Sequence, residues 1–256
     1  MNGRKLIRAR LAELAAAFAL LTRLPVFLLP ALPQPAPGAS AWAYPLVGAT
    51  VGAIGGGIYW LAHGLSLPPP LTSLYALAAM ILATGALHED GLADAADALA
   101  GKSAEQSLAI MRDHRIGTYG ALALLLTLAL RVSAIALLVQ PALVTAALLA
   151  SGAASRSSAT ALMAALPHAR SDGLSVAAGR PSVWLAAAGV ALAFAIGLLL
   201  LPFGSAAGVI ASAILVASIV GCLAWARLGG QTGDVLGACC SLAECAALTL
   251  LVALAV

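Results

Sequence analysis

Charged side chains are scarce in this chain of 256 residues. They make up 9% of the sequence, whereas apolar residues make up 62%. No Asp, Glu, Lys or Arg occurs in residues 24–87 or in residues 181–226. Because an ordinary soluble domain carries roughly 25% charged residues, this composition excludes such a domain and predicts an integral membrane protein.

The sequence also lacks Cys-x-x-Cys pairs and stripes of basic residues interleaved with aromatic ones. The four cysteines lie in apolar segments without a Cys-x-x-Cys spacing, so we interpret them as small apolar side chains rather than as metal ligands or disulfide partners. The thirteen Lys and Arg residues are scattered, and no basic stripe is interleaved with aromatic residues. The sequence therefore indicates no nucleic-acid partner.

Long apolar runs fill most of the chain. A spanning helix needs ~20 mostly apolar residues, and these runs are continuous and rich in Ala and Leu, without the alternation of barrel strands. We therefore predict an all-α fold: one domain, residues 1–256, that forms a polytopic helical bundle in the lipid bilayer with about seven transmembrane helices. The predicted spans are residues 41–66, 71–87, 118–140, 142–166, 183–203, 205–226 and 236–256.

The connections between these spans alternate between uncharged and charged segments. The loops at 65–70, 140–141 and 202–205 carry no charge, and neither does the C-terminal tail. Nearly all remaining charge lies in residues 1–40, 88–117, 167–182 and 227–235. Because Lys and Arg favour the cytoplasmic side, we expect these four segments to share the cytoplasmic face of the cell inner membrane and the C-terminus to lie outside.

The N-terminal stretch, residues 6–29, needs a separate interpretation. Basic residues before an apolar run resemble a signal peptide, but Glu13 and the later Arg23 do not fit one. We predict an N-terminal helix that lies in the cytoplasmic interface of the membrane, with Arg23 among the lipid headgroups.

The chain concentrates its acidic residues in one place, since six of its ten acidic side chains lie in residues 85–119. Asp90, Asp94 and Asp97 are spaced so that their side chains fall within about 60° of one another on a helix. Three carboxylates on one face repel one another unless a cation neutralises them, and oxygen ligands suit Mg²⁺ or Mn²⁺. The alternative is a solvated helix start. No Lys or Arg interrupts the sequence from Glu89 to Lys102, which favours the metal site.

Other polar residues lie near this acidic face in sequence. His88 is interpreted as a proton carrier, an interfacial residue or, least of all, a ligand, because Mg²⁺ prefers oxygen. Arg112 and Arg115 flank Asp113, and two guanidiniums near a carboxylate–metal cluster suit phosphate groups. The alternative for the arginines is anchoring on the cytoplasmic side.

Three charges lie deep inside predicted spans. Arg131, Arg156 and Glu244 lie about 15–20 Å from the charged face, judged by the helical rise per residue. A lone charge at that depth costs at least ~2.5–3.5 kcal/mol. They should therefore line one polar cavity that binds an anionic substrate, or form a structural pair. Closer to the surface, the loop at 227–234 can present backbone amides to a phosphate, although this signal is weak by itself.

Together these motifs resemble the cobalamin synthase family, the adenosylcobinamide-GDP ribazoletransferases. The similarity runs in order from about residue 18 to the end of the chain. It rests on TRLP (22–25), YPLVGATVG (44–52), TGALHEDGLADAADAL (84–99), IMRDHRIGTYG (110–120), Ser155-Arg156, PHARSDGL (167–174) and GGQTGDVLGA (229–238).

The resemblance implies a multi-pass, Mg²⁺-dependent enzyme of cobalamin synthesis. Such enzymes join adenosylcobinamide-GDP to α-ribazole or α-ribazole 5′-phosphate and release GMP. Catalytic roles are then expected for His88, Asp94 and Asp97, and metal coordination for Asp90, Asp94 and Asp97. Residues expected to bind the substrate and its phosphates are Arg112, Asp113, Arg115, Arg131, Arg156, Arg170, Gly229, Gly230, Thr232, Asp234 and Glu244. Whether the protein forms a homo-oligomer stays open.

The sequence departs from the family's pattern at two positions. The family often has a glycine where Ala86 stands and an acidic residue where Ser241 stands. Position 241 would share a helix face with Asp234, so the missing acid makes a metal role for the 234–244 segment weaker. We therefore assign the predicted metal site to the acidic face of residues 90–97.

Other functional classes fit the sequence less well. A CDP-alcohol phosphotransferase would carry an arginine where Ala95 follows Asp94, and an aromatic prenyltransferase would carry two acidic sites where only the Asp90–Asp94 spacing is seen. A transporter could use the deep charges as ion contacts, but no pair of related halves is visible.

Overall fold

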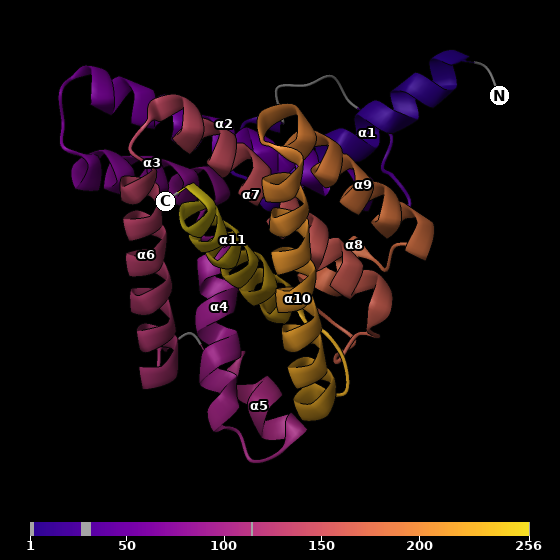
Figure 1. Cartoon of the computed structure of the whole chain (residues 1–256). Coiled ribbons are helices and arrows are strands. Elements are labelled where there is room, and N and C mark those ends of the chain that lie inside the picture. Colours follow the sequence, from indigo (N-terminus) through magenta and orange to yellow (C-terminus); the bar gives the residue numbers. More distant parts are fainter. Residues whose placement is uncertain (1–2, 27–31, 114, 256) are drawn as a thin grey trace.

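The computed structural model describes residues 3–26, 32–113 and 115–255, and within these ranges the fold is all-α (Figure 1). About 80% of it is helical and no strands form in the described residues, which confirms the predicted fold class. The long helices are α1 (Gly3–Leu21), α2 (Tyr44–Gly64), α3 (Pro69–Thr84), α4 (Leu87–Asp97), α6 (Thr118–Leu138), α7 (Pro141–Ala165), α9 (Val183–Leu200), α10 (Phe203–Leu228) and α11 (Gly233–Ala255). The short ones are η2 (Ala41–Ala43), η3 (Ala98–Ala100), α5 (Ala104–Ile110) and α8 (Leu174–Ala178).

The number of membrane spans is smaller than the sequence predicts. Within the described residues, five segments are long and apolar enough to cross a membrane: η2 with α2, and helices α6, α9, α10 and α11. A sixth candidate is α3 together with the segment Leu87–Ala100, although the two parts are bent by 87°. Helix α7 forms where a span was predicted but falls outside this set, because Arg156 and several serines lower its hydropathy. The predicted count of seven is therefore not confirmed.

The bend between α3 and α4 replaces the straight span predicted for residues 71–87. Helix α3 ends at Thr84, and both Gly85 and Ala86 adopt left-handed backbone conformations, with φ of 65° and 58°. Two such residues in a row cannot continue a right-handed helix, so the chain turns and restarts as α4. The acidic helix α4 therefore runs toward α5 at the lower end of the molecule in Figure 1.

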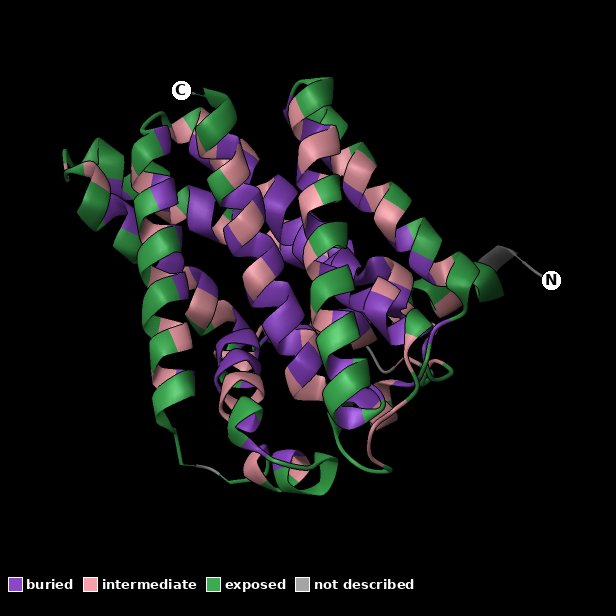
Figure 2. Ribbon diagram, turned by 60° about the horizontal axis from the view of Figure 1, so that its bottom comes forward, coloured by how far each residue is buried: buried purple, intermediate pink, exposed green. Residues whose placement is uncertain are grey.

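Glycines bring α2 and α7 together at the centre of the bundle. The four-residue spacing of Gly48, Gly52 and Gly56 predicts close helix packing. The structure confirms it: a Cβ atom at Gly48 would collide with the backbone of Gly152, and one at Gly52 with the backbone of Leu148. Figure 2 shows a buried centre surrounded by exposed outer helices.

The N-terminal helix α1 packs against the start of α2. Ala17 and Leu21 join the cluster around Tyr44, and the Trp42 indole N–H donates to Glu13 at 2.6 Å. Helix α1 is not among the candidate spans. The predicted interfacial position stays a prediction, and residues 27–29 of that stretch lie outside the described residues.

Two of the charged connections lie apart from the uncharged ones. Figure 1 places α5, the start of α6 and the α10–α11 connection toward its lower end. The α6–α7 turn, the α9–α10 turn and the C-terminus lie toward its upper end. This arrangement agrees with a shared face for the charged connections at 88–117 and 227–235. Figure 1 places α1, which belongs to the charged segment 1–40, toward its upper right. A face shared by all four charged segments therefore stays a prediction, as does the side of the membrane on which it lies.

Candidate active site

Helices α4 and α11 cross at a pair of glycines. A Cβ atom at Gly91 would lie 2.9 Å from the carbonyl oxygen of Asp234 and 3.1 Å from the Cα atom of Gly237. Only a helix without a side chain at this point can approach so closely. The crossing brings the acidic first turns of the two helices together, so that Asp90 and Asp234 interact through their charges.

The loop that precedes α11 is fixed by hydrogen bonds. Gln231 forms a short parallel bridge with His168, donating its N–H to the carbonyl of Pro167 at 2.8 Å. Buried Thr232 caps α11, because its hydroxyl accepts from the N–H of Val235 at 3.2 Å. Gly229 ends α10 in the left-handed conformation, with φ of 71°, and the backbone around residues 167–169 leaves no room for a side chain at Gly230. These contacts explain the glycines structurally, and phosphate binding by this loop stays a prediction.

The predicted acidic face forms on α4. Asp90 is exposed, whereas Asp94 and Asp97 are half-buried. Asp97 accepts two backbone hydrogen bonds, from Gly117 at 2.7 Å and from Gly120 at 2.8 Å, and so caps the N-terminus of α6. Its carboxylate leaves no space for a Cβ atom at either glycine. Asp97 thus has a clear structural task, which the sequence did not reveal.

The metal site itself stays a prediction. In the part of the chain that the structure describes, no three His, Cys, Asp or Glu side chains are arranged to hold an ion. The donors near the α4–α11 crossing are nevertheless all carboxylate oxygens, which are the ligands that Mg²⁺ prefers. Because Mg²⁺ is often held by only one or two carboxylates together with substrate phosphates, this donor set fits the ion.

The predicted phosphate-binding arginines lie around the acidic face. Arg170 is 3.4 Å from Asp234, while Arg112 binds both oxygens of Asp172 at 2.9 and 3.0 Å. The charged connections before α6 and α8 are therefore tied to each other. Arg115 is fully exposed and paired with Asp113 at 2.8 Å, which raises the pKa of Arg115. Arg112, Arg115 and Arg170 can reach an anionic ligand only by exchanging or sharing these carboxylate partners.

The three deep charges meet in one buried cluster, together with a fourth charged residue, Glu89. Arg131 binds Glu89 at 2.8 Å and Glu244 at 2.5 Å, and Arg156 also binds Glu244. The exposed fractions of Arg131, Arg156 and Glu244 are 3%, 3% and 1%. Two guanidiniums and two carboxylates balance one another, which offsets the cost of burying charge. The predicted convergence is confirmed in the form of the alternative, a buried set of ion pairs. A polar cavity lined by these residues, and their contact with substrate, stay predictions.

His88 lies on the side of α4 that faces away from the acidic residues. It borders a cavity lined also by Tyr44, Arg156 and Ser175. Both ring nitrogens of His88 and the hydroxyl of Ser175 are buried without a hydrogen-bond partner. Buried polar atoms normally have partners, so this cavity suits water or a hydrogen-bonding ligand.

Comparisons with known proteins decide the family. The model of the family described as cobalamin-5-phosphate synthase matches residues 13–252. The chain belongs to the cobalamin-5-phosphate synthase family. An adenosylcobinamide-GDP ribazoletransferase from Bradyrhizobium diazoefficiens is 44% identical over 92% of this chain and 91% of its own length. One from Mesorhizobium japonicum is 43% identical over 94% and 93%, respectively. No solved structure matches this chain.

Membership of this family confirms the sequence-based resemblance. It also decides against the CDP-alcohol phosphotransferase, prenyltransferase and transporter alternatives. Sequence reasoning missed Glu89 and Ser175, which belong to the buried cluster and to the His88 cavity. Glu89 could have been found from the cost of burying Arg131 and Arg156 with Glu244 alone, since two cations require a second anion.

Proposed function

We propose that this chain joins adenosylcobinamide-GDP to α-ribazole, or to α-ribazole 5′-phosphate, and releases GMP. The observation that carries the proposal is 44% identity to a named ribazoletransferase over 92% of the chain. The clustering of the family's acidic and basic motif residues at the α4–α11 crossing supports it.

In the proposed reaction, a ribose hydroxyl that is free in both α-ribazole and α-ribazole 5′-phosphate attacks the β-phosphorus of the GDP group. A new phosphorus–oxygen bond forms, the bond between the two phosphates breaks, and GMP leaves with the bridging oxygen. With either acceptor, the proton of the attacking hydroxyl must pass to a base. An exposed carboxylate of α4 is better placed for this than His88, whose ring is buried on the other side of the helix.

We propose that Asp90 and Asp94 hold Mg²⁺, with Asp234 close by on α11. The ion would supply positive charge to offset the charge that develops on the phosphate oxygens. Asp97 would contribute mainly by ordering the start of α6, since Gly117 and Gly120 already bind both of its oxygens. Arg112, Arg115 and Arg170 would orient the phosphates.

The activity is tested by mass spectrometry of the products. Purified protein is mixed with Mg²⁺, adenosylcobinamide-GDP and α-ribazole, and the expected products are adenosylcobalamin and GMP. The same mixture with EDTA in place of Mg²⁺ should yield neither product. Intact adenosylcobinamide-GDP in both mixtures, from protein shown to be folded, would contradict the proposal.

We also propose that the active site faces the cytoplasm of the inner membrane. The alternation of charged and uncharged connections supports this orientation. After replacement of the four native cysteines, new cysteines at Ser66 and Ser205 should react with an impermeant label added outside. Cysteines at Ser103 and Ser182 should react only after the membrane is opened. Labelling of position 103 from outside intact cells would overturn the orientation.

A further inference from the structure

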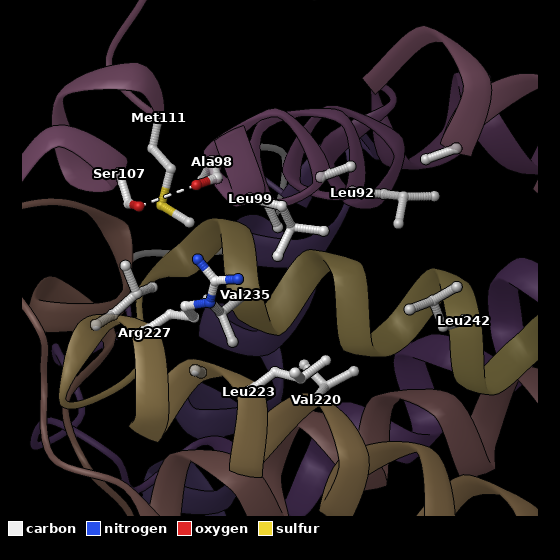
Figure 3. Close-up of a pocket in the computed structure, with 15 residues that line it drawn as sticks. Leu92, Ala98, Leu99, Ser107, Met111, Val220, Leu223, Arg227, Val235 and Leu242 are labelled. Atoms are coloured by element: carbon white, nitrogen blue, oxygen red, sulfur yellow. Dashed lines mark hydrogen bonds between the residues drawn. The ribbon is translucent and has the colours of Figure 1, made fainter. Parts of the chain in front are cut away.

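A groove runs along the molecule between α4 and α10 and is lined almost wholly by apolar side chains (Figure 3). Helix α11 forms its back through Val235 and Leu242, and Met111, just after α5, closes one end. Among the described residues that line it, Arg227 in the last turn of α10 is the only one that carries a charge. Ser107 adds a hydroxyl, but this group already donates to the carbonyl of Ala98 at 2.9 Å.

The groove follows from how the surrounding helices pack. Helix α4 packs closely against α6 and α11, with Gly91 at the α4–α11 crossing, whereas α10 packs against α11 and, to a smaller extent, against α5. A gap therefore remains between α4 and α10. Leu99 and Leu223 on its two sides are 48% and 51% exposed, so the gap is open at the molecular surface.

The surface onto which the groove opens is the one expected to meet lipid. The most apolar windows of α6 and α10 are only 28% and 22% buried, whereas that of α11 is 72% buried. Helix α11 is thus set back behind two helices that expose apolar side chains. In a bilayer, the molecules that have access to such a recess are the lipids.

Arg227 gives the groove a charge preference. Its side chain is exposed and forms no ion pair with any described residue. Figure 3 shows its guanidinium beside Val235 at the groove. A guanidinium binds a phosphate with two parallel hydrogen bonds, and its position at the charged end of α10 matches the depth of lipid headgroups.

We propose that this groove binds one anionic phospholipid, with an acyl chain between α4 and α10 and its phosphate on Arg227. The acyl chain gains little by moving from the equally apolar bilayer into the groove. Selectivity must therefore come from the charge at Arg227, and neutral lipids should bind less well. This inference does not depend on the proposed reaction.

Native mass spectrometry of the full-length protein tests the site. Protein in detergent is given equal amounts of phosphatidylglycerol and phosphatidylcholine with identical acyl chains. In the complex with one lipid, phosphatidylglycerol should be favoured by about fivefold, the factor expected from one basic side chain near a membrane surface. Arg227→Gln should bring the ratio close to one, and Arg227→Lys should keep most of the preference.

Two further variants separate this site from general attraction of lipid to basic protein. Arg8→Gln removes one exposed positive charge from α1 and should leave the ratio unchanged. Leu223→Trp narrows the mouth of the groove at an exposed position and should lower the amount of the one-lipid complex. An unchanged ratio in Arg227→Gln, or equal binding of the two lipids to the wild type, would overturn the proposal. Release of phosphatidylglycerol by added α-ribazole would overturn it as well and assign the groove to the substrate's aromatic base.

Discussion

Glu89 and Asp90 are neighbours on α4 that carry the same charge in opposite surroundings. Glu89 is buried and paired with Arg131, whereas Asp90 is exposed beside the α4–α11 crossing. The buried cluster of Glu89, Arg131, Arg156 and Glu244 is electrically neutral. Helix α4's exposed face carries carboxylates alone. Charge is retained in the interior only where it is balanced. We therefore expect the buried cluster to stabilise helix packing and the exposed carboxylates to act in the proposed binding of a cation and a substrate.

The largest effect on stability is expected when the buried cluster loses its central anion. Glu244→Gln keeps the size of the side chain but leaves Arg131 and Arg156 with one carboxylate between them. Breaking a buried ion pair in this way typically costs ~3–5 kcal/mol. The midpoint of thermal unfolding should fall markedly, and the yield of folded protein should fall with it.

A second substitution shows whether charge balance is the cause. Adding Arg156→Met to Glu244→Gln leaves Glu89 and Arg131 as a neutral pair and should restore much of the lost stability. Ser241→Ala, one turn earlier on α11, is the matched control, because its buried hydroxyl has no partner and its loss should cost little. A double variant no more stable than Glu244→Gln alone would contradict the interpretation of the cluster as a balanced set.

The opposite result is expected on the exposed face. Asp94→Asn removes one charge from the proposed Mg²⁺ site and should lower turnover by at least about 100-fold, since metal stabilisation of transition-state charge is worth several kcal/mol. Because a half-buried residue at the helix surface is changed, thermal stability should shift by less than ~1 kcal/mol. Product formation at several Mg²⁺ concentrations, alongside thermal unfolding, measures both. Near-normal turnover at low Mg²⁺ would contradict the metal assignment.

Asp97 should behave as an intermediate between these two extremes. Asp97→Asn retains one carbonyl oxygen for Gly117 or Gly120 but loses the negative charge at the N-terminus of α6. We expect a stability loss of ~1 kcal/mol, which is the usual effect of removing a helix cap. Thermal unfolding beside Asp94→Asn measures the difference, and equal stability of the two variants would show that the cap contributes nothing.

The sequence predicts local features well and distant pairings poorly. Apolar runs locate α2, α6, α9, α10 and α11, because each helix carries its own hydropathy. The spacing of residues 90–97 correctly predicts one helical face. The contact of Glu89 with Arg131, by contrast, joins residues 42 positions apart and is not predicted. The meeting of Arg156 with Glu244, 88 positions apart, is predicted only from the cost of burying charge. Local spacing cannot reveal such pairs, and only the charge balance of the interior hints at them.

The last and smallest effect concerns the turn that sets the direction of α4. The sequence departs from the family's pattern at Ala86, and the structure shows why glycine is common there, because this residue has φ of 58°. An alanine in the left-handed region costs the folded state roughly 1–2 kcal/mol, and glycine removes this cost. Glycine also gives the unfolded chain more conformational freedom, which offsets part of the gain in stability. Ala86→Gly should therefore stabilise the fold by about 0.5–1 kcal/mol and leave both charge sets intact. Ala78→Gly, at an exposed position inside α3, should instead destabilise it by about 1 kcal/mol. Thermal unfolding of the two variants measures this difference in sign, and a loss of stability in both would mean that the turn at residue 86 carries no strain.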